Sequence, residues 1–112
     1  KNLTVTGCRM KLPSQVTLKK YGLSEDDYIE LYNKHDGACH VCLVKPKNST
    51  RALAIEHEHV PGFKKMLPEE KRKYCRGIAC FICNYRLLTR GVTLERLRNA
   101  VRYLEEYESI VK

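Results

Sequence analysis

Apolar side chains recur at helical spacing in the first half of the chain, in the run from Tyr28 to His35. Residues three and four apart share one face of a helix, so this run predicts an amphipathic helix. Ser24 lies just ahead of the run and is followed by three acidic residues, a pattern typical of a helix N-terminus. Gly37 predicts the end of the helix.

A second apolar stripe of helical spacing runs through the C-terminal part of the chain. It consists of Leu94, Leu97, Val101, Leu104 and Val111. Thr93 precedes the stripe and predicts an N-cap. We therefore expect a long final helix, which either packs on its own domain or pairs with a second copy of the chain in a homodimer.

The remaining segments carry weaker patterns. Residues 1–20 have scattered Lys and Arg without a helical stripe, which indicates a basic arm or a short strand pair. Residues 51–55 predict a short strand, and residues 80–90 predict a short helix. Residues 60–75 contain two prolines and many charged side chains, so we expect a solvated insertion that is helical from 68 to 74.

Length and charge narrow the class of protein. A chain of 112 residues favours one domain, and a formal net charge of +8 favours a polyanionic partner such as DNA, although a merely basic soluble protein is the alternative on charge alone. We predict a basic arm over residues 1–20 and a domain over residues 21–112. The apolar stretches are only a few residues long, so the sequence predicts neither a membrane span nor a signal peptide. The expected location is the cytoplasm, of the host if the chain is phage-encoded.

Four of the six cysteines form two C-x-x-C pairs. Zinc prefers four thiolates in a tetrahedron, and cysteines paired at this interval are typical of zinc knuckles, whereas disulfide frameworks scatter them. The predicted ligands of a structural Zn²⁺ are Cys39, Cys42, Cys80 and Cys83. We expect His40 to point outward and Cys75 to be a partly buried thiol in a reducing compartment. A zinc with four thiolates has no position left for a reacting water, so any chemistry must lie elsewhere.

Candidate chemistry lies between the two cysteine pairs, in the sequence E-H-E-H from Glu56 to His59, and at Asn84, which directly follows the last zinc cysteine. A carboxylate and a side-chain carbonyl can hold Mg²⁺ or Mn²⁺, and a neutral His can take a proton from water. The conjunction predicts a hydrolytic metal site. Taken alone, E-H-E-H is also compatible with an exposed polar stretch or with a transition-metal site unrelated to catalysis.

Strand geometry places a condition on this site. Successive side chains of an ideal strand point to opposite faces, which would separate Glu56 from His57. The strand must therefore end or bend between these two residues if they share a site. Otherwise Glu58 becomes the competing ligand.

At these residues the sequence resembles the recombination endonuclease VII family of phages, a branch of the HNH nucleases. The matching elements are YGLSEDDY from Tyr21 to Tyr28, CHVC from Cys39 to Cys42, EHEH from Glu56 to His59, and RGIACFICN from Arg76 to Asn84. The resemblance covers residues 21–107, and its last element is the most specific. It implies a ββα hairpin–helix site beside a Cys₄ zinc.

The resemblance also implies roles for the site residues. Glu56 and Asn84 would ligate a catalytic Mg²⁺, and His57 would be the general base on the attacking water. His59 would contact the scissile phosphate or help assemble the metal site. The metal would stabilise charge on the phosphate and on the leaving 3′ oxygen.

Two departures from the family pattern bear on function. The family usually has Asp where this chain has Glu56, and the extra methylene moves the carboxylate. The segment from Val60 to Cys75 is longer than the usual hairpin connection, so it is either a substrate-contacting loop or a solvated surface insertion. Basic residues that would suit phosphates in this segment are Lys64, Lys65, Lys71, Arg72 and Lys73. The nucleic-acid-binding residues that we predict are Lys64, Lys65, Arg72 and Arg76.

The sequence as a whole predicts an α+β fold with a ββα-metal (HNH) core, a Cys₄ zinc and flanking helices. The predicted function is metal-dependent hydrolysis of phosphodiester bonds in DNA, possibly branched or junction DNA. One alternative is an HNH nicking, packaging or homing endonuclease that acts on duplex DNA. The other is a non-catalytic zinc module that binds nucleic acid, for which the E-H-E-H sequence and Asn84 would be unnecessary.

Overall fold

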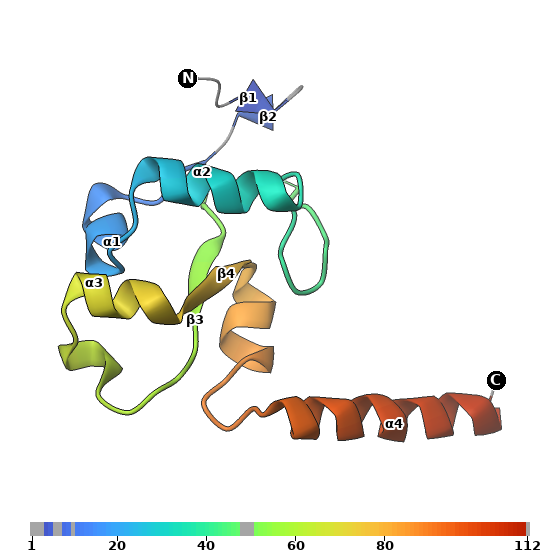
Figure 1. Ribbon diagram of the computed structural model, residues 1–112. Helices are drawn as coiled ribbons and strands as arrows, with labels where there is room; N and C mark the ends of the chain where they lie inside the picture. The colour runs from blue at the N-terminus through green and yellow to red at the C-terminus, as the bar shows by residue number, and fades with distance from the viewer. Residues whose placement is uncertain (1–3, 6–7, 10, 48–50, 112) are drawn as a thin grey trace.

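The computed structural model describes the backbone of residues 4–5, 8–9, 11–47 and 51–111 and the side chains of residues 11–47 and 51–110. Its elements in chain order are β1 (Thr4–Val5), β2 (Cys8–Arg9), α1 (Gln15–Lys20), α2 (Glu25–Lys34), β3 (Ala54–His57), η1 (Phe63–Lys65), α3 (Pro68–Lys71), η2 (Arg72–Tyr74), β4 (Cys75–Ala79), η3 (Cys83–Leu87) and α4 (Leu94–Val111). The fold therefore mixes helices with two small sheets, as predicted (Figure 1).

The sheet formed by β3 and β4 is antiparallel and lies at the centre of the fold (Figure 1). Its paired residues are Ala54 and Ala79, Ile55 and Ile78, Glu56 and Gly77, and His57 and Cys75. The register shifts between Glu56 and His57, because Arg76 has no opposite residue on β3. The pairing is thus irregular between Glu56 and His57, where the strand must end or bend if these two residues share a site.

Helix α2 begins and ends as the sequence predicts. The Ser24 side chain accepts from the Asp27 amide at 3.0 Å, and the Asp27 carboxylate accepts from the Ser24 amide at 2.9 Å, which completes a capping box. Beyond the helix, Gly37 adopts a positive φ of 84° and donates to the Tyr32 carbonyl at 2.9 Å. This φ is strained for any residue with a side chain, so the turn favours glycine, and a Cβ here would also displace the Tyr32 hydroxyl, 2.7 Å away.

The core lies between α2 and the β3–β4 sheet. It consists of Leu18, Leu23, Tyr28, Cys39, Leu53, Ile55, Ile78, Ala79 and Cys83. Tyr28 is fully buried, and its hydroxyl donates to the Leu53 carbonyl at 2.7 Å. This bond ties α2 to the backbone just before β3 and satisfies a polar group that would be costly to bury alone.

Two sequence expectations need correction. The strand pair offered as one alternative for residues 1–20 is present as β1 and β2, but the same segment also contains helix α1, which the sequence did not predict. Leu18 of α1 is only 1% exposed, so residues 15–20 belong to the folded body. The segment 60–75 has its predicted helical part in α3 and η2, but it is not simply solvated. Phe63 and Lys71 are both buried, and the Phe63 ring stacks on His57 at the end of β3.

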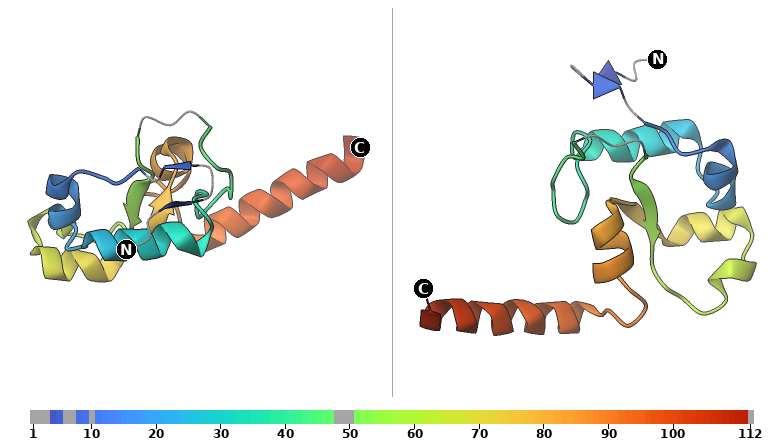
Figure 2. Two further views of the ribbon diagram at one scale, coloured as in Figure 1. Left: turned by 90° about the horizontal axis from the view of Figure 1, so that it is seen from above. Right: turned by 180° about the vertical axis from the view of Figure 1, so that it is seen from behind.

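Helix α4 projects away from the rest of the molecule (Figures 1 and 2). The Thr93 hydroxyl accepts from the Arg96 amide at 3.0 Å, which confirms the predicted N-cap. Every described side chain of α4 is exposed except the half-buried Leu97, so the apolar stripe does not pack on its own domain. The side chain of Val111 lies outside the described residues. Among the described helices, none has the length and apolar character needed to cross a membrane.

Candidate functional site

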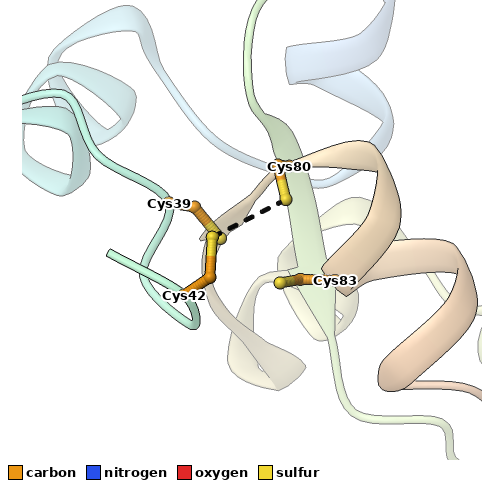
Figure 3. Close-up of side chains that lie close together, drawn as sticks. All are labelled: Cys39, Cys42, Cys80 and Cys83. Carbon is orange, nitrogen blue, oxygen red and sulfur yellow. Dashed lines mark hydrogen bonds between the residues drawn. The ribbon is translucent and has the colours of Figure 1, made fainter. Parts of the chain in front are cut away.

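The two cysteine pairs meet at one point of the structure. Figure 3 shows the side chains of Cys39, Cys42, Cys80 and Cys83 gathered in one place. Their four sulfur atoms lie within 4.8 Å of one another. The Sγ atoms of Cys42 and Cys80 are 4.0 Å apart. A tetrahedral zinc with bonds of about 2.3 Å separates its sulfurs by about 3.8 Å. The donor set therefore fits zinc after small side-chain movements.

Backbone bonds hold the first cysteine pair against the sheet. Leu43 has a positive φ of 62° and donates to the Cys39 carbonyl at 2.9 Å, which closes the turn. The His40 amide donates to the Ile78 carbonyl at 3.0 Å and docks the turn on β4. The second pair follows β4 directly, so the sheet sets the distance between the two pairs.

The electrostatics of the cluster also suit a cation. Burial raises the pKa of the Cys39 thiol, but hydrogen bonds from the backbone of Cys42, Cys80 and Val41 outweigh burial and lower the pKa to about 6. Burial raises the pKa of the Cys83 thiol, and the neighbouring thiols raise it further. Four thiolates repel one another in the absence of a metal, whereas Zn²⁺ removes that repulsion.

The two other candidate zinc ligands lie outside the cluster. Contrary to the expectation that it points outward, His40 is half-buried, and its Nε2 lies 2.8 Å from the Leu31 carbonyl oxygen. Cys75 is a partly buried thiol, as predicted, and burial raises its pKa to about 11. Neither belongs to the metal-binding group found among the described residues.

His57 lies in a cleft of about 920 Å³ beside the end of β3. Its ring stacks on Phe63 with the ring centroids 3.9 Å apart and the planes inclined by 4°. Tyr21 and His59 also flank the His57 ring, at centroid distances of 5.8 Å and 5.2 Å. The stack leaves the imidazole little freedom to turn, so the cleft presents its nitrogens in a fixed orientation.

Asn84 and His57 line a common cavity of about 420 Å³, which adjoins Tyr21 and Tyr85. Asn84 directly follows the zinc cysteine Cys83, and its amide donates to the Cys80 carbonyl at 2.9 Å. This bond fixes the backbone that carries Asn84 relative to the cluster of four cysteines. The structure brings these two predicted site residues together.

Glu56 lies apart from them. Both of its carboxylate oxygens accept from the Arg76 guanidinium, one of them at 3.0 Å from Nε. Glu56 is 5% exposed and lines a different cavity, together with His40 and Gly77. In this arrangement the carboxylate is occupied by Arg76, and the predicted pairing of Glu56 with Asn84 around one cation is not formed.

The remaining two residues of E-H-E-H have separate environments. His59 is exposed, and its Nε2 lies 3.1 Å from the Leu88 carbonyl oxygen. Glu58 is exposed, and its amide donates to the Tyr74 carbonyl at 2.9 Å. Glu58 lines neither of the two cavities that contain His57, so nothing here favours it as the competing ligand.

The predicted nucleic-acid-binding residues divide into two groups. Lys64 and Lys65 line the His57 cleft. Arg72 instead donates to the Asp27 carboxylate and to the Gly22 carbonyl, and Arg76 is held by Glu56. These internal contacts occupy both arginines. A guanidinium that is paired with a carboxylate is a poor partner for phosphate, so this arrangement does not favour either arginine as a DNA contact.

Sequence reasoning missed several residues of the cleft. Lys20, Tyr21 and Arg90 come from segments distant in sequence, and only the fold brings them to His57. Phe63 carried a signal, because it is one of only two phenylalanines in the chain and lies within a charged segment. A large apolar side chain in such a segment indicates burial against a neighbouring element.

In a comparison with protein families, the model described as recombination endonuclease VII matches residues 14–106. The chain belongs to the recombination endonuclease VII family. This confirms the resemblance found in the sequence. The matched region includes α1 and most of α4 as well as the zinc cluster and the His57 cleft.

Two curated relatives of this chain are phage proteins. The chain is 27% identical to the Gene 59 protein of Mycobacterium phage L5 over 88 residues. This alignment covers 78% of this chain and 46% of that protein. The chain is 27% identical over 90 residues to the Gene 59 protein of Mycobacterium phage D29, covering 80% and 47% respectively. The chain thus spans about half the length of the curated relatives that it matches. No solved structure gives a significant match.

Proposed function

We propose that the chain is a metal-dependent endonuclease of the HNH type that hydrolyses phosphodiester bonds in DNA. The observation that carries the proposal is the position of His57. Its ring lies in a cleft that contains five cationic side chains and, among the described lining residues, no acidic one. Such a cleft attracts a phosphate backbone to the histidine.

His57 is suited to act as a general base. Its Nδ1 lies 3.0 Å from the Glu58 carbonyl oxygen, and a carbonyl can only accept. Nδ1 therefore carries the proton in the neutral ring, and the Nε2 lone pair is free to take a proton from water. The deprotonated water oxygen then attacks phosphorus, and the bond to the leaving sugar oxygen breaks.

A divalent cation in this site, Mg²⁺ or Mn²⁺, would stabilise charge on the phosphate when bound. Asn84 would hold it, because a side-chain carbonyl next to the zinc cluster is a rigid oxygen donor. Glu56 fits this role only if its pair with Arg76 opens. The proposed ligand set of Glu56 and Asn84 therefore requires a rearrangement around the register shift in β3.

The order of elements supports the HNH assignment. An antiparallel pair, β3 and β4, is followed by a helical turn over residues 81–87, and this order corresponds to a ββα unit. We infer that the four cysteines hold a structural zinc at the base of this unit. The zinc would fix Asn84 relative to β4 and take no part in the reaction.

The proposed substrate is DNA with a branch or junction, as the family description of a recombination endonuclease suggests. A phage nuclease of this kind would act in the cytoplasm of the host. A duplex-specific HNH nickase or homing enzyme is the related alternative, and a non-catalytic binding module is the alternative of a different class. The position of His57 and Asn84 in one cavity favours a nuclease over a binding module.

The experiment that tests the proposal is a cleavage assay with the zinc-loaded protein. Junction, duplex and single-stranded DNA of matched length are incubated with Mg²⁺, with Mn²⁺ and without added divalent metal. We expect cleavage that requires the metal and is fastest on the junction. Tight DNA binding without cleavage of any substrate would instead favour the binding module.

We also propose that two copies of the chain pair through α4. Its stripe of Leu94, Val101 and Leu104 is exposed by more than half at each residue, and burial of such a stripe favours association. Leu94 and Val101 are seven residues apart, and the next position at this heptad spacing is Glu108. A parallel pair would set two Glu108 side chains against each other, so we infer an antiparallel pair.

Charge along α4 supports the same arrangement. The first part of the helix carries Arg96, Arg98 and Arg102 and one acidic residue, Glu95, whereas the second carries Glu105, Glu106 and Glu108 and no basic residue. If two antiparallel α4 helices cross between Val101 and Leu104, Arg98 of each helix lies next to the partner's Glu105. The two-fold symmetry of the pair repeats this contact. Two active sites in one particle would suit a substrate that needs two cuts.

A further inference from the structure

Lys71 has a buried side-chain stem, and its ammonium group has no anionic partner among the described residues. The residue is only 8% exposed, and the described part of the structure shows no hydrogen bond or ion pair to its side chain. Its Nζ lies 5.6 Å from the centroid of the Phe63 ring. A lysine is rarely covered to this extent, so this side chain requires an explanation.

The ammonium of Lys71 faces the His57 cleft. Lys71 is among the residues that line the cleft. In the described structure, every fully buried side-chain nitrogen or oxygen has a hydrogen-bond partner. Because Nζ has none, it must reach the open space of the cleft while the rest of the side chain is covered. The stem is held in place by burial, so the position of the charge is fixed.

Phe63 connects this charge to His57. The Phe63 ring stacks on His57, with the ring centroids 3.9 Å apart, and the Lys71 ammonium lies over the same ring. Lys64 and Lys65 follow Phe63 in the chain and line the same cleft, but they are exposed. An anion at Nζ of Lys71 would therefore lie one aromatic ring away from the imidazole.

We propose that Lys71 binds a phosphodiester group of the substrate backbone adjacent to the one that is cut. This inference rests on the proposed function, because it assigns a neighbouring phosphate relative to His57. A phosphate supplies a negative charge opposite the fixed ammonium and accepts hydrogen bonds from it. Since Lys71 belongs to the segment that is longer than the usual hairpin connection, the site is a property of this segment.

The test compares Lys71→Met with Lys73→Met. The first variant keeps the buried stem and removes the charge, whereas the second removes an exposed charge that does not line the cleft. Binding to labelled junction DNA is measured as a function of salt, with Ca²⁺ in place of Mg²⁺ so that no cleavage is needed. Zinc content and thermal unfolding are checked for both variants.

Loss of one phosphate contact makes the slope of log K against log salt less negative by about 0.9. At 0.1 M salt this corresponds to a loss of about eightfold in binding affinity. We expect that change for Lys71→Met and less than a twofold change for Lys73→Met. Lys71→Arg should retain the wild-type slope. Equal slopes for Lys71→Met and Lys73→Met would overturn the proposal, even if the wild-type protein cleaves DNA.

A second measurement avoids any variant that fails to fold. The ring resonances of Phe63 are followed by NMR in the wild-type protein while junction DNA or inorganic phosphate is added. We expect the DNA to shift them, because a phosphate at Lys71 lies next to the ring. Phe63 resonances that stay unchanged at saturating DNA, or that respond to inorganic phosphate alone, would contradict a backbone phosphate at this site. Absence of cleavage bears only on the proposed function.

Discussion

At the scale of single residues, the pairing of Glu56 with Arg76 decides how the site is read. The Glu56 side chain is 7% exposed and that of Arg76 is 48% exposed, so the carboxylate depends on the guanidinium for its hydrogen bonds. Arg76 directly precedes Gly77, where a Cβ would lie 2.5 Å from His40 Nδ1. The R-G sequence of the family pattern therefore has a structural reason in this chain.

Glu56→Gln tests whether Glu56 also serves the reaction. Loss of the charge should lower the free energy of unfolding by about 1–2 kcal/mol, because a charge-assisted bond to a half-exposed Arg76 becomes a neutral one. Cleavage should also fall, and part of it should return at high Mg²⁺ or Mn²⁺ if Glu56 is a ligand. Denaturant unfolding and single-turnover cleavage across metal concentrations measure the two effects. Unchanged cleavage by the folded variant would restrict Glu56 to a structural role.

Cys75 gives a pH dependence of stability. Burial raises the pKa of its thiol to about 11 in the folded protein, whereas an unfolded thiol ionises near 8.5. Between these values the unfolded chain loses a proton that the folded chain keeps, so stability falls as pH rises above about 8.5. In Cys75→Ala this part of the decline should be absent. Urea unfolding at pH 8 and pH 10 should show a loss in wild type that exceeds the loss in the variant.

At the scale of elements, the fold depends on a few connections between short pieces. Asp27 caps α2 and also pairs with Arg72, the first residue of η2, so it joins the helix to the segment that lines the cleft. Hydrogen bonds from Arg72 and Ser24 hold the pKa of the Asp27 carboxyl well below its usual range. The carboxyl group is therefore ionised at neutral pH.

Asp27→Asn should weaken this connection without removing a residue of the cleft. We expect a loss of about 1 kcal/mol, because the pair is partly exposed and the cap is only partly replaced by an amide. Equilibrium unfolding of the zinc-loaded protein measures the change. A matched control is Asp36→Asn, whose pair with Lys45 is exposed on both sides and should contribute little. Equal stability of the two variants would argue against the connection.

Sequence reasoning succeeded where a pattern is local. The capping box at Ser24, the glycine turn at Gly37 and the Thr93 cap depend on neighbouring residues, so their elements were predictable. The cysteine spacing likewise predicted the cluster of four sulfurs. Helix α1 was missed because it is short and buries only Leu18. The environment of Glu56 could not be predicted, since it depends on the register shift opposite Arg76.

At the scale of the whole molecule, the structure has a body and a projecting helix, with principal dimensions of 51 × 40 × 20 Å (Figure 2). The body holds the zinc cluster and the cleft, whereas α4 offers an apolar stripe that no described element covers. Pairing of two copies would bury that stripe and bring two clefts into one particle. The oligomeric state is therefore linked to the kind of substrate that we propose.

Val101→Glu should abolish the pairing, because it places a charge at the centre of the apolar stripe. The control is Tyr103→Glu, which changes an exposed residue outside that stripe. Sedimentation equilibrium over a range of concentrations should show a dimer for wild type and for the control, and a monomer for Val101→Glu. A wild-type protein that is monomeric at every concentration would contradict the role given to α4.

The most direct test of the central claim is single-turnover cleavage of junction DNA by His57→Ala. Loss of a general base typically lowers a rate by about 10²- to 10⁴-fold, so cleavage should nearly vanish. DNA affinity and zinc content should stay close to wild type, since His57 belongs to neither the cysteine cluster nor the cationic residues. His35→Ala, outside the cleft, should cleave normally. Full activity of His57→Ala would contradict the account.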